Sequence, residues 1–482
     1  MRQRGSKTLP MLTRHEFFDG ALALAATPAT ARFAAASAPV GAKRFDSSAT
    51  IADLRAFARG IEEIGTESFR TSSREAFTRE LARAEAVCAQ PRTADEFYVA
   101  LARAAASLND GHVSVAGWSS RAAHADAGGG EFPLRTIVDD DGALVVVDDL
   151  SNEGGIEPGT VVTSIDGHDA RDVVAYAIGL HGGQNEALRR AFARVFDAIY
   201  LIGGPRSAGE PYEVALLDTS GVARARKLTA VTTKTINERY AAKAAPFVPY
   251  ADRGIIGAAA VCYYNSCQDG VKFREFLTGF FARAKAAKAR GVVVDIRRNG
   301  GGNSKVNDEL FAFVTGKPYR QYGGSRTRVS ERLKREYGRE KYVEVYGLEA
   351  WGRKDGDVVV SAGDALRPPR DEPGRFDGPA YLLIGTRTFS SAMACAAAAK
   401  AYGLMTLAGV ETGEPVYSTG EIYELALPRT GFRVTITTKV WLPPEPLPPD
   451  SGVRPDIVVP TTRADRRAGR DPVLEAVLTR LK

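Results

Sequence analysis

Two short apolar runs, each followed at once by a turn of small residues and a helical pattern, constrain the fold more than any other feature. The first is Gly291–Ile296, and the turn after it contains three glycines at 300–302. The second is Tyr381–Gly385, which leads through Thr386–Ser391 into an Ala-rich helix. Continuous apolar runs are typical of strands buried on both faces of a sheet. The two strand-turn-helix units therefore predict an α/β fold with one layered core.

Composition excludes several classes of protein. The 482 residues are 44% hydrophobic and 25% charged, which is typical of a globular chain with several structural units. The net charge of +6 is small for this length, and no nucleic-acid motif accompanies the basic stretches, so we expect no nucleic-acid partner. No run of about 18 uninterrupted apolar residues occurs, so we expect no integral membrane span. No Cys/His cluster has metal-ligand spacing, and no metal site is predicted.

The first 38 residues resemble an export signal and leader. Basic residues precede a short apolar run, Gly20–Ala31, and small-residue cleavage patterns end at Ala31 and Ala38. The sequence Thr13–Phe18 is similar to a twin-arginine signal, with His15 in place of the second arginine. We therefore expect an exported bacterial protein, periplasmic or secreted. A disordered leader on a cytoplasmic protein is the alternative.

Changes of pattern divide the remaining chain into successive units. Helical periodicity, with capping-box sequences at Ser72–Glu75 and Thr93–Glu96, gives way to short strands and turns after Phe132 and to an α/β pattern after Gly254. The long charged linker between the two strand-turn-helix units is expected to form surface helices and loops. The expected units are an N-terminal helical unit at 46–118, a β-rich unit at 131–232, an α/β core at 240–465 with a charged insertion at 304–378, and a C-terminal helix at 466–482.

Part of the β-rich unit resembles the centre of a PDZ domain. A Pro-Gly turn leads into a buried strand and an Asp-Gly turn leads out of it within Gly155–Gly167, and an amphipathic stretch follows near Asp172–Ile178. In this arrangement the helix forms one wall of a groove to which a peptide adds as an extra strand. A small β unit without a ligand remains the alternative.

The two turns contain residues suited to nucleophilic chemistry. Ser390 and Ser391 lie between a buried strand and a helix, where a nucleophile is held rigidly beside helical N–H groups. A simple helix cap is the structural alternative. The glycines at 300–302 let the main chain approach a substrate closely and point amides toward it. Neither phosphate-binding motif, Gly-x-x-x-x-Gly-Lys-Ser/Thr or Gly-x-Gly-x-x-Gly, is present.

Four motifs in the same order along the chain resemble those of the S41 serine peptidases. They are Asp110–His112, Asp295–Gly302, Thr388–Ala392 and Gly452–Ile457. This family includes the C-terminal processing, or tail-specific, proteases and the tricorn protease core. The resemblance covers most of the chain after the leader, and it implies a ClpP/crotonase-like layered core, a polypeptide substrate and no metal or organic cofactor. Whether the chain forms a homo-oligomer is left open.

The resemblance also assigns roles to individual residues. Ser390 matches the nucleophile, with Ser391 as the fallback, and the amides of Ser391 and Gly301 match the oxyanion donors. Pro415 stands where the processing proteases have their lysine base. The chain is therefore closer to the tricorn-type branch, in which a histidine activates the serine, and His112 matches that histidine. Imidazole suits the role because it exchanges a proton near neutral pH.

The group that orients the histidine is not identified by the motifs. Tricorn-type sites have a serine beside the histidine and a distant glutamate, but Gly111 stands where that serine would be. The candidates for the orienting residue are Ser114, Glu411, Glu414, Glu421 and Asp450.

We therefore expect a serine peptidase that hydrolyses polypeptides through an acyl-enzyme. The alternative is a catalytically inactive S41-like protein that binds peptides, lipids or small apolar ligands. Labelling by a fluorophosphonate discriminates between the two. An α/β-hydrolase esterase is disfavoured because no Gly-x-Ser-x-Gly sequence occurs.

Overall fold

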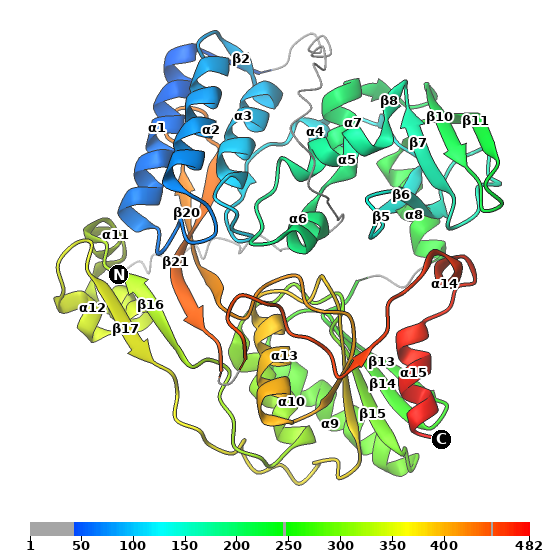
Figure 1. Ribbon diagram of the computed structural model, residues 1–482, viewed down its shortest axis with the longest axis vertical. Helices are drawn as coiled ribbons and strands as arrows, with labels where there is room; N and C mark the ends of the chain where they lie inside the picture. Colours follow the sequence, from blue (N-terminus) through cyan, green and yellow to red (C-terminus); the bar gives the residue numbers. More distant parts are fainter. Residues whose placement is uncertain (1–42, 244–246, 445–446) are drawn as a thin grey trace, which may run out of the picture.

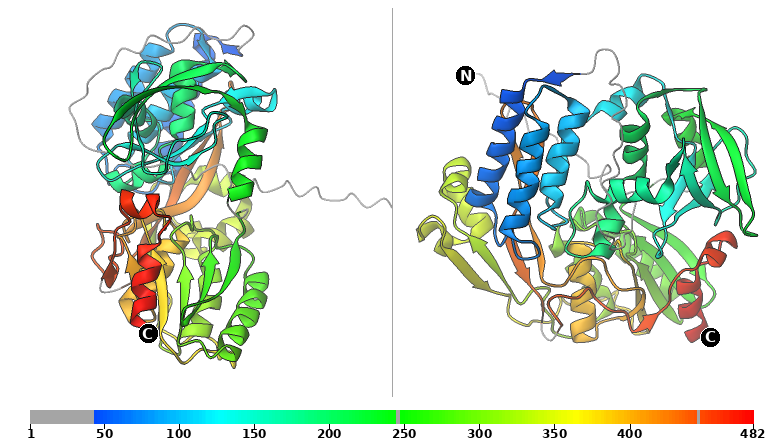
Figure 2. Two further views of the ribbon diagram at one scale, coloured as in Figure 1. Left: turned by 90° about the vertical axis from the view of Figure 1, so that its right-hand side faces the viewer. Right: turned by 45° about the horizontal axis from the view of Figure 1, so that its top comes forward.

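The computed structural model describes residues 43–243, 247–444 and 447–482, and the predicted export segment at 1–38 lies outside these ranges. The described chain forms two tiers (Figures 1 and 2). The lower tier in Figure 1 is an α/β core, and the upper tier places a three-helix unit beside a strand-rich unit.

A six-stranded sheet forms the centre of the core. Its strands run parallel from β14 to β22, and only the edge strand β13 is antiparallel. The strands in spatial order are β13 (Tyr250–Ile256), β14 (Ala259–Tyr264), β15 (Gly291–Asp295), β18 (Ala380–Ile384), β19 (Thr406–Gly409) and β22 (Ile457–Val458). The helices of this region are α9 (Gly270–Ala286), η2 (Ser304–Val306), α10 (Asn307–Val314), α13 (Ser391–Tyr402), α14 (Arg463–Arg467) and α15 (Pro472–Arg480).

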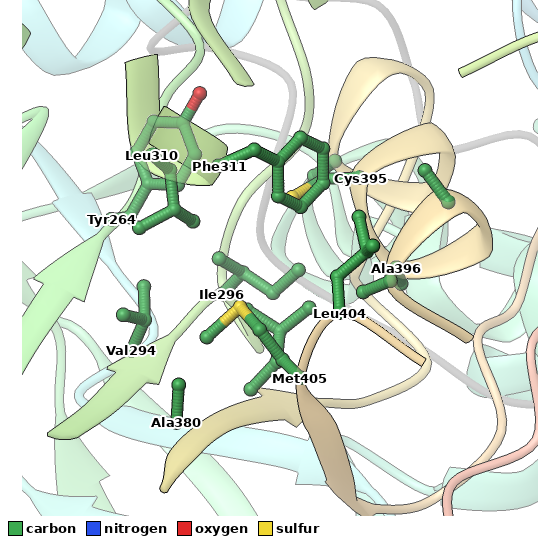
Figure 3. Close-up of a cluster of buried hydrophobic side chains, with 14 of the residues drawn as sticks. Tyr264, Val294, Ile296, Leu310, Phe311, Ala380, Cys395, Ala396, Leu404 and Met405 are labelled. Carbon is green, nitrogen blue, oxygen red and sulfur yellow. The ribbon is translucent and has the colours of Figure 1, made fainter. Parts of the chain in front are cut away.

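Helices cover both faces of this sheet. On one face, side chains of α9, α10 and α13 form the largest cluster of buried residues, in which Ile296, Phe311 and Cys395 lie together (Figure 3). On the other face α15 buries Val473 and Val477 against the sheet. Every residue of β15 and β18 is buried, as the continuous apolar runs indicated. The predicted layered α/β class is confirmed.

A second, antiparallel sheet connects the core to the three-helix unit. The long strands β20 and β21 run from the core toward the helices of the upper tier (Figure 1). The strands in spatial order are β17 (Val358–Ala362), β16 (Gly324–Arg328), β21 (Arg433–Leu442) and β20 (Ser418–Ala426), and β3 (Val115–Ala116) also pairs with β21. Packed with them are α1 (Ser47–Ile64), α2 (Arg74–Val87), α3 (Ala94–Ala106), α11 (Glu331–Tyr346) and α12 (Leu348–Gly352), with β1 (Arg44–Phe45) pairing β2 (Arg92–Thr93).

The charged segment between the two strand-turn-helix units contributes more to the interior than its composition indicated. Strand β16 lies inside the second sheet, between β17 and β21. On α11, Leu333 and Tyr342 are buried against the helical unit. The expectation of surface helices and loops is wrong for these elements, because a few buried side chains among many charged ones suffice to anchor a helix.

The strand-rich unit has its own hydrophobic core. Its main sheet has the order β11-β10-β7-β6-β5, with β8 paired to β7, and α5 and α7 pack in the same apolar cluster. The strands of the unit are β4 (Gly129–Glu131), β5 (Leu134–Val138), β6 (Leu144–Asp149), β7 (Val161–Ile165), β8 (His168–Asp169), β9 (Arg206–Ser207), β10 (Pro211–Leu217), β11 (Ala223–Thr229) and β12 (Val231–Thr232). Its helices are α4 (Ser120–Asp126), α5 (Ala170–Ile178), α6 (Glu186–Phe192), α7 (Val195–Gly203) and α8 (Thr233–Lys243).

Local sequence signals agree with most helix starts. Thr93 caps α3 in a capping box with Glu96, whereas α2 is capped by Ser73 rather than by Ser72. All four cysteines are buried, and none forms a disulfide bond in the described chain. Within the described ranges no helix is both long and apolar enough to cross a membrane, and no three metal-ligating side chains converge on one point.

The aromatic contact between α9 and α10 supplies a test of the core. Phe281 is fully buried and stacks on Phe313 with 4.9 Å between ring centroids. We expect Phe281→Ala to lower the free energy of unfolding by about 3–5 kcal/mol, because the truncation leaves a cavity. Val271→Ala on the same helix is the control, since Val271 is 71% exposed. Urea denaturation followed by circular dichroism measures both, and equal effects would contradict this packing.

Candidate active site

Ser390 lies at the junction of β18 and α13 in an unusual backbone conformation. Its φ is +56° and its ψ is −126°, a combination that non-glycine residues rarely adopt. Its side chain makes no capping hydrogen bond to the helix, although the residue occupies the N-cap position. The strained turn therefore presents the hydroxyl outside the helix, and strain of this kind clusters at functional sites.

The hydroxyl of Ser390 meets the imidazole of His112, which lies 278 positions earlier in the chain. His112 Nε2 is 3.1 Å from Ser390 Oγ. The His112 residue is 9% exposed, and its ring packs against Phe389 with 4.4 Å between centroids. The structure thus brings the two principal sequence candidates into hydrogen-bonding contact.

The other imidazole nitrogen faces Thr419 of β20. Thr419 Oγ1 lies 3.3 Å from His112 Nδ1 and donates a 2.7 Å hydrogen bond to Asp110 Oδ1. Because the Thr419 hydroxyl donates to the carboxylate, it is an acceptor toward the imidazole. This network favours the tautomer with its proton on Nδ1, which leaves Nε2 as an acceptor for the Ser390 hydroxyl.

Asp110 is the anchor of this network. Only 5% of the residue is exposed, and its Oδ1 also accepts a 2.9 Å hydrogen bond from the His112 backbone N–H. Its Oδ2 accepts a 2.9 Å hydrogen bond from Thr437 Oγ1 on β21. Several donors therefore compensate the burial of this carboxylate, which would otherwise be costly.

The segment that precedes α6 covers the site from the strand-rich unit. Gln184 Nε2 donates to Thr419 Oγ1 at 3.1 Å, and Leu188 and Phe192 of α6 pack on Phe389. A Cβ at Gly111 would lie 2.9 to 3.2 Å from the side chains of Leu188, Phe192 and Phe389. Glycine at 111 thus permits the close packing of this cover, and the hydroxyl beside the imidazole comes from β20 instead.

Glu414 is the one predicted orienting candidate that the structure places next to His112. Its Oε1 is 3.7 Å from His112 Nδ1 and has no hydrogen-bond partner in the described chain. Its Oε2 accepts a hydrogen bond from the Ser390 backbone N–H. Complete burial raises the pKa of the Glu414 carboxyl well above its usual value, and the nearby charge of Asp110 acts in the same direction.

The other four orienting candidates make contacts elsewhere. The Ser114 hydroxyl contacts Thr435 Oγ1 at 3.0 Å. Glu411 accepts from the Gly452 amide at 2.9 Å, and Asp450 pairs with Arg70 on the surface at 3.2 Å. The Glu421 side chain is exposed on β20. None of these contacts reaches the imidazole.

The residues matched to the oxyanion donors lie beside Ser390. A Cβ on Gly301 would be 2.7 Å from Ser390 Cβ, so the glycine turn touches the serine turn. The Gly301 N–H, however, donates to Asn299 Oδ1 at 2.9 Å, and that amide is engaged within its own turn. The Ser391 hydroxyl donates to Gly302 O at 2.7 Å, and Ser391 begins α13.

Asp110 and Thr419 are site residues that the sequence patterns did not identify as orienting groups. Asp110 was visible in its motif with His112, and an acid two positions from a candidate base is a usable signal. Thr419 lies 307 residues from His112, and only the pairing of β20 with β21 brings it to the site. Its sequence neighbourhood carries no signal for this role.

A serine hydroxyl in contact with an imidazole, at the end of a buried strand of an α/β core, defines the class of serine-type hydrolases. The model of peptidase family S41 matches residues 263–459. The matched residues include Ser390 and most of the α/β core, and the match supports a serine-type peptidase of family S41. No curated protein matches the chain.

Solved structures with similar folds include mature CPAF. It is 14% identical to this chain with a TM-score of 0.63, and the match covers 90% of this chain and 96% of that one. Mature CPAF complexed with lactacystin gives a TM-score of 0.62 at 14% identity, covering 90% and 97%. The photosystem II D1 C-terminal processing protease is 15% identical with a TM-score of 0.42, and the match covers 86% of this chain and 93% of that one. The likeness to CPAF shows that the fold is shared over nearly the whole length of both chains.

The raised pKa of Glu414 predicts how stability depends on pH. The folded protein holds the Glu414 proton to a higher pH than the unfolded chain, whose carboxyl titrates near 4.5. The stability from this group is fully present below that pH and is lost as the pH rises through the folded-state pKa. The Glu414→Gln variant has no carboxyl at this position and does not suffer this loss. We therefore expect the melting temperature of the variant, minus that of the wild type, to increase as the pH rises from about 4 to about 8.

Melting curves across this pH range measure the effect. Glu421→Gln is the matched control, because Glu421 is exposed, and its difference from the wild type is expected to stay constant. A constant difference for Glu414→Gln as well would contradict the assignment.

Proposed function

We propose that the protein hydrolyses peptide bonds of polypeptides through an acyl-enzyme, with Ser390 as nucleophile and His112 as general base. The observation that carries the proposal is the 3.1 Å separation of His112 Nε2 and Ser390 Oγ in a largely buried site. Ser390 is favoured over Ser391 because the Ser391 hydroxyl donates to Gly302 O.

In the first half of the reaction Ser390 Oγ attacks the peptide carbonyl carbon while its proton passes to His112 Nε2. The tetrahedral intermediate then collapses, and Nε2–H gives the proton to the leaving amine. In the second half a water molecule attacks the acyl-enzyme, its proton passes to Nε2, and the acid product leaves as Ser390 recovers its proton. No cofactor enters either step.

Thr419 and Asp110 are positioning residues in this proposal. When Nε2 accepts a proton, the imidazolium keeps its Nδ1–H directed at Thr419 Oγ1, which in turn donates to Asp110. The carboxylate stabilises the positive charge through one intervening hydroxyl. Glu414 contributes by fixing the Ser390 backbone, since its carboxyl accepts the Ser390 N–H.

The oxyanion is stabilised by the Ser391 N–H at the start of α13, where the helix dipole also favours negative charge. The Gly301 amide is the second donor in this proposal, and it exchanges its present acceptor, Asn299 Oδ1, for the substrate oxygen. This exchange requires rotation of the peptide between Gly300 and Gly301, which two successive glycines allow.

Two further parts of the proposal rest on sequence patterns. The strand-rich unit, with α5 beside its sheet, is proposed to bind peptides in the manner of a PDZ domain. Export from the cytoplasm is proposed from the composition of the first 38 residues.

Substitution of the two serines tests the nucleophile. We expect Ser390→Ala to abolish degradation of casein and labelling by a fluorophosphonate, because no hydroxyl then faces His112. Ser391→Ala is expected to retain both, with an unchanged melting temperature for each variant. If only Ser391→Ala lost casein degradation and labelling, Ser391 rather than Ser390 would be the nucleophile. Absence of labelling in the folded wild type would favour the alternative of an inactive binding protein.

The role of Thr419 is tested by removing only its hydroxyl. We expect Thr419→Val to lower kcat by about tenfold or more with little change in KM, whereas Thr419→Ser stays close to the wild type. The acidic limb of the kcat/KM profile is expected to move to lower pH, because the protonated imidazole loses an acceptor. Thr327→Val, a buried threonine of the same sheet, is the control. If kcat fell equally in Thr419→Ser, which keeps the hydroxyl, the loss in Thr419→Val would not come from removal of the hydroxyl.

A further inference from the structure

A pocket of about 480 Å³ opens beside η2, the short helix that follows the glycine turn, and neither Ser390 nor His112 lines it. It lies between the start of α10, the segment 319–325 that leads into β16, and the segment 362–370 that follows β17. The segments before β16 and after β17 are held together by a bridge between Tyr319 and Arg367. Trp441 of β21 completes the lining, so the pocket has walls from four parts of the chain.

Two of its walls connect directly to the candidate active site. Gln321 lines the pocket and accepts a 2.8 Å hydrogen bond from Asn307 Nδ2, which also donates to Ser391 O at 2.8 Å. Tyr322, the next residue of the lining, is half-buried. The ring of Tyr322 stacks on Trp441 with 4.5 Å between centroids. Trp441 pairs across β21 and β20 with Ser418, the neighbour of Thr419. The pocket is thus joined to the start of α13 through Asn307 and to the neighbour of Thr419 through Trp441.

Arg320 is the chemical feature that distinguishes the pocket. Its side chain lines the cavity, and its Nε is buried without a hydrogen-bond partner. No carboxylate or carbonyl of the described chain pairs with its guanidinium, although most other arginines of this region form ion pairs. A half-buried guanidinium without an acceptor favours an anionic ligand, most of all a planar carboxylate that accepts two hydrogen bonds.

The charged side chains that line the pocket leave a net positive charge. Glu309 is bound by Arg274 and Arg370, and Asp364 lies 3.8 Å from Arg367. Asp308 accepts from the neutral side chains of Tyr319 and Gln321 and keeps its charge, which Lys305 at the rim balances. Four basic and three acidic side chains thus line the pocket, and Arg320 is the half-buried basic one without an ion pair in the described chain, beside the aromatic floor of Tyr322 and Trp441.

We propose that this pocket is a specificity subsite that binds a carboxylate of the polypeptide substrate, with Arg320 as the positively charged hydrogen-bond donor and the Tyr322–Trp441 pair as the apolar floor. The carboxylate is either the free C-terminus or an acidic side chain close to the cleaved bond. The assignment of the pocket as a substrate subsite rests on the proposed peptidase function. Binding of a carboxylate in the pocket, however, does not require cleavage of the peptide.

Binding is measured on the full chain with Ser390→Ala, so that no turnover occurs. The probes are three short Ala-rich peptides with a neutral dye: one with a free C-terminal carboxylate, one amidated with a single glutamate, and one amidated and uncharged. By fluorescence anisotropy we expect at least one carboxylate peptide to bind about tenfold more tightly than the uncharged one. The peptide that shows the preference identifies the source of the carboxylate.

The preference is expected to disappear when Arg320→Gln is added and to survive when Arg339→Gln is added. Arg339 is an exposed arginine on α11, outside the pocket, and it controls for the loss of one positive charge. Equal binding of all three peptides, or a preference that survives Arg320→Gln, would overturn the proposal. Because the readout is binding, it stays informative even if fluorophosphonate labelling of the wild type fails and the peptidase mechanism is rejected.

Discussion

The buried carboxylate of Asp110 is the interaction on which the site depends. It joins the loop that carries His112 to β20 and β21, through Thr419 and Thr437. These two contacts span 309 and 327 positions of sequence, and they hold the imidazole beside a serine from a different sheet. Hydrogen bonds to a charged group contribute about 1.5–3 kcal/mol each, and a buried carboxylate without them would be strongly unfavourable. The geometry of the site is thus a consequence of satisfying one buried charge.

Two further constraints place the hydroxyl opposite the imidazole. The small, mostly alanine side chains of α13 let this helix pack closely on the core sheet, and every residue from Ser391 to Ala399 is buried. The strained backbone of Ser390 then turns its side chain away from the helix that follows. The Glu414 carboxyl holds this conformation by accepting the Ser390 N–H, and its pKa is raised by its complete burial, to which the nearby charge of Asp110 adds. Strain and a buried acid are both concentrated at the position where chemistry is proposed.

Local patterns in the sequence predicted much of the fold. The apolar runs indicated β15 and β18, the turns after them indicated the glycine and serine loops, and the capping box indicated the start of α3. The pairing of distant strands was not predictable in this way. The position of β16 inside the second sheet, and of Thr419 beside His112, depends on contacts between residues far apart in sequence. The engagement of the Gly301 amide by Asn299 is likewise a matter of peptide orientation, which residue types alone do not determine.

The pairing of Ser390 with His112 can be tested by a crystal structure of the protein after reaction with a phosphonate inhibitor. We expect a covalent bond from phosphorus to Ser390 Oγ, with His112 Nε2 still next to that oxygen and Thr419 Oγ1 next to Nδ1. One phosphonyl oxygen is expected to face the Ser391 N–H. A bond to any other residue, or a His112 ring displaced from the modified serine with its Nδ1 away from Thr419, would show that this pairing is wrong.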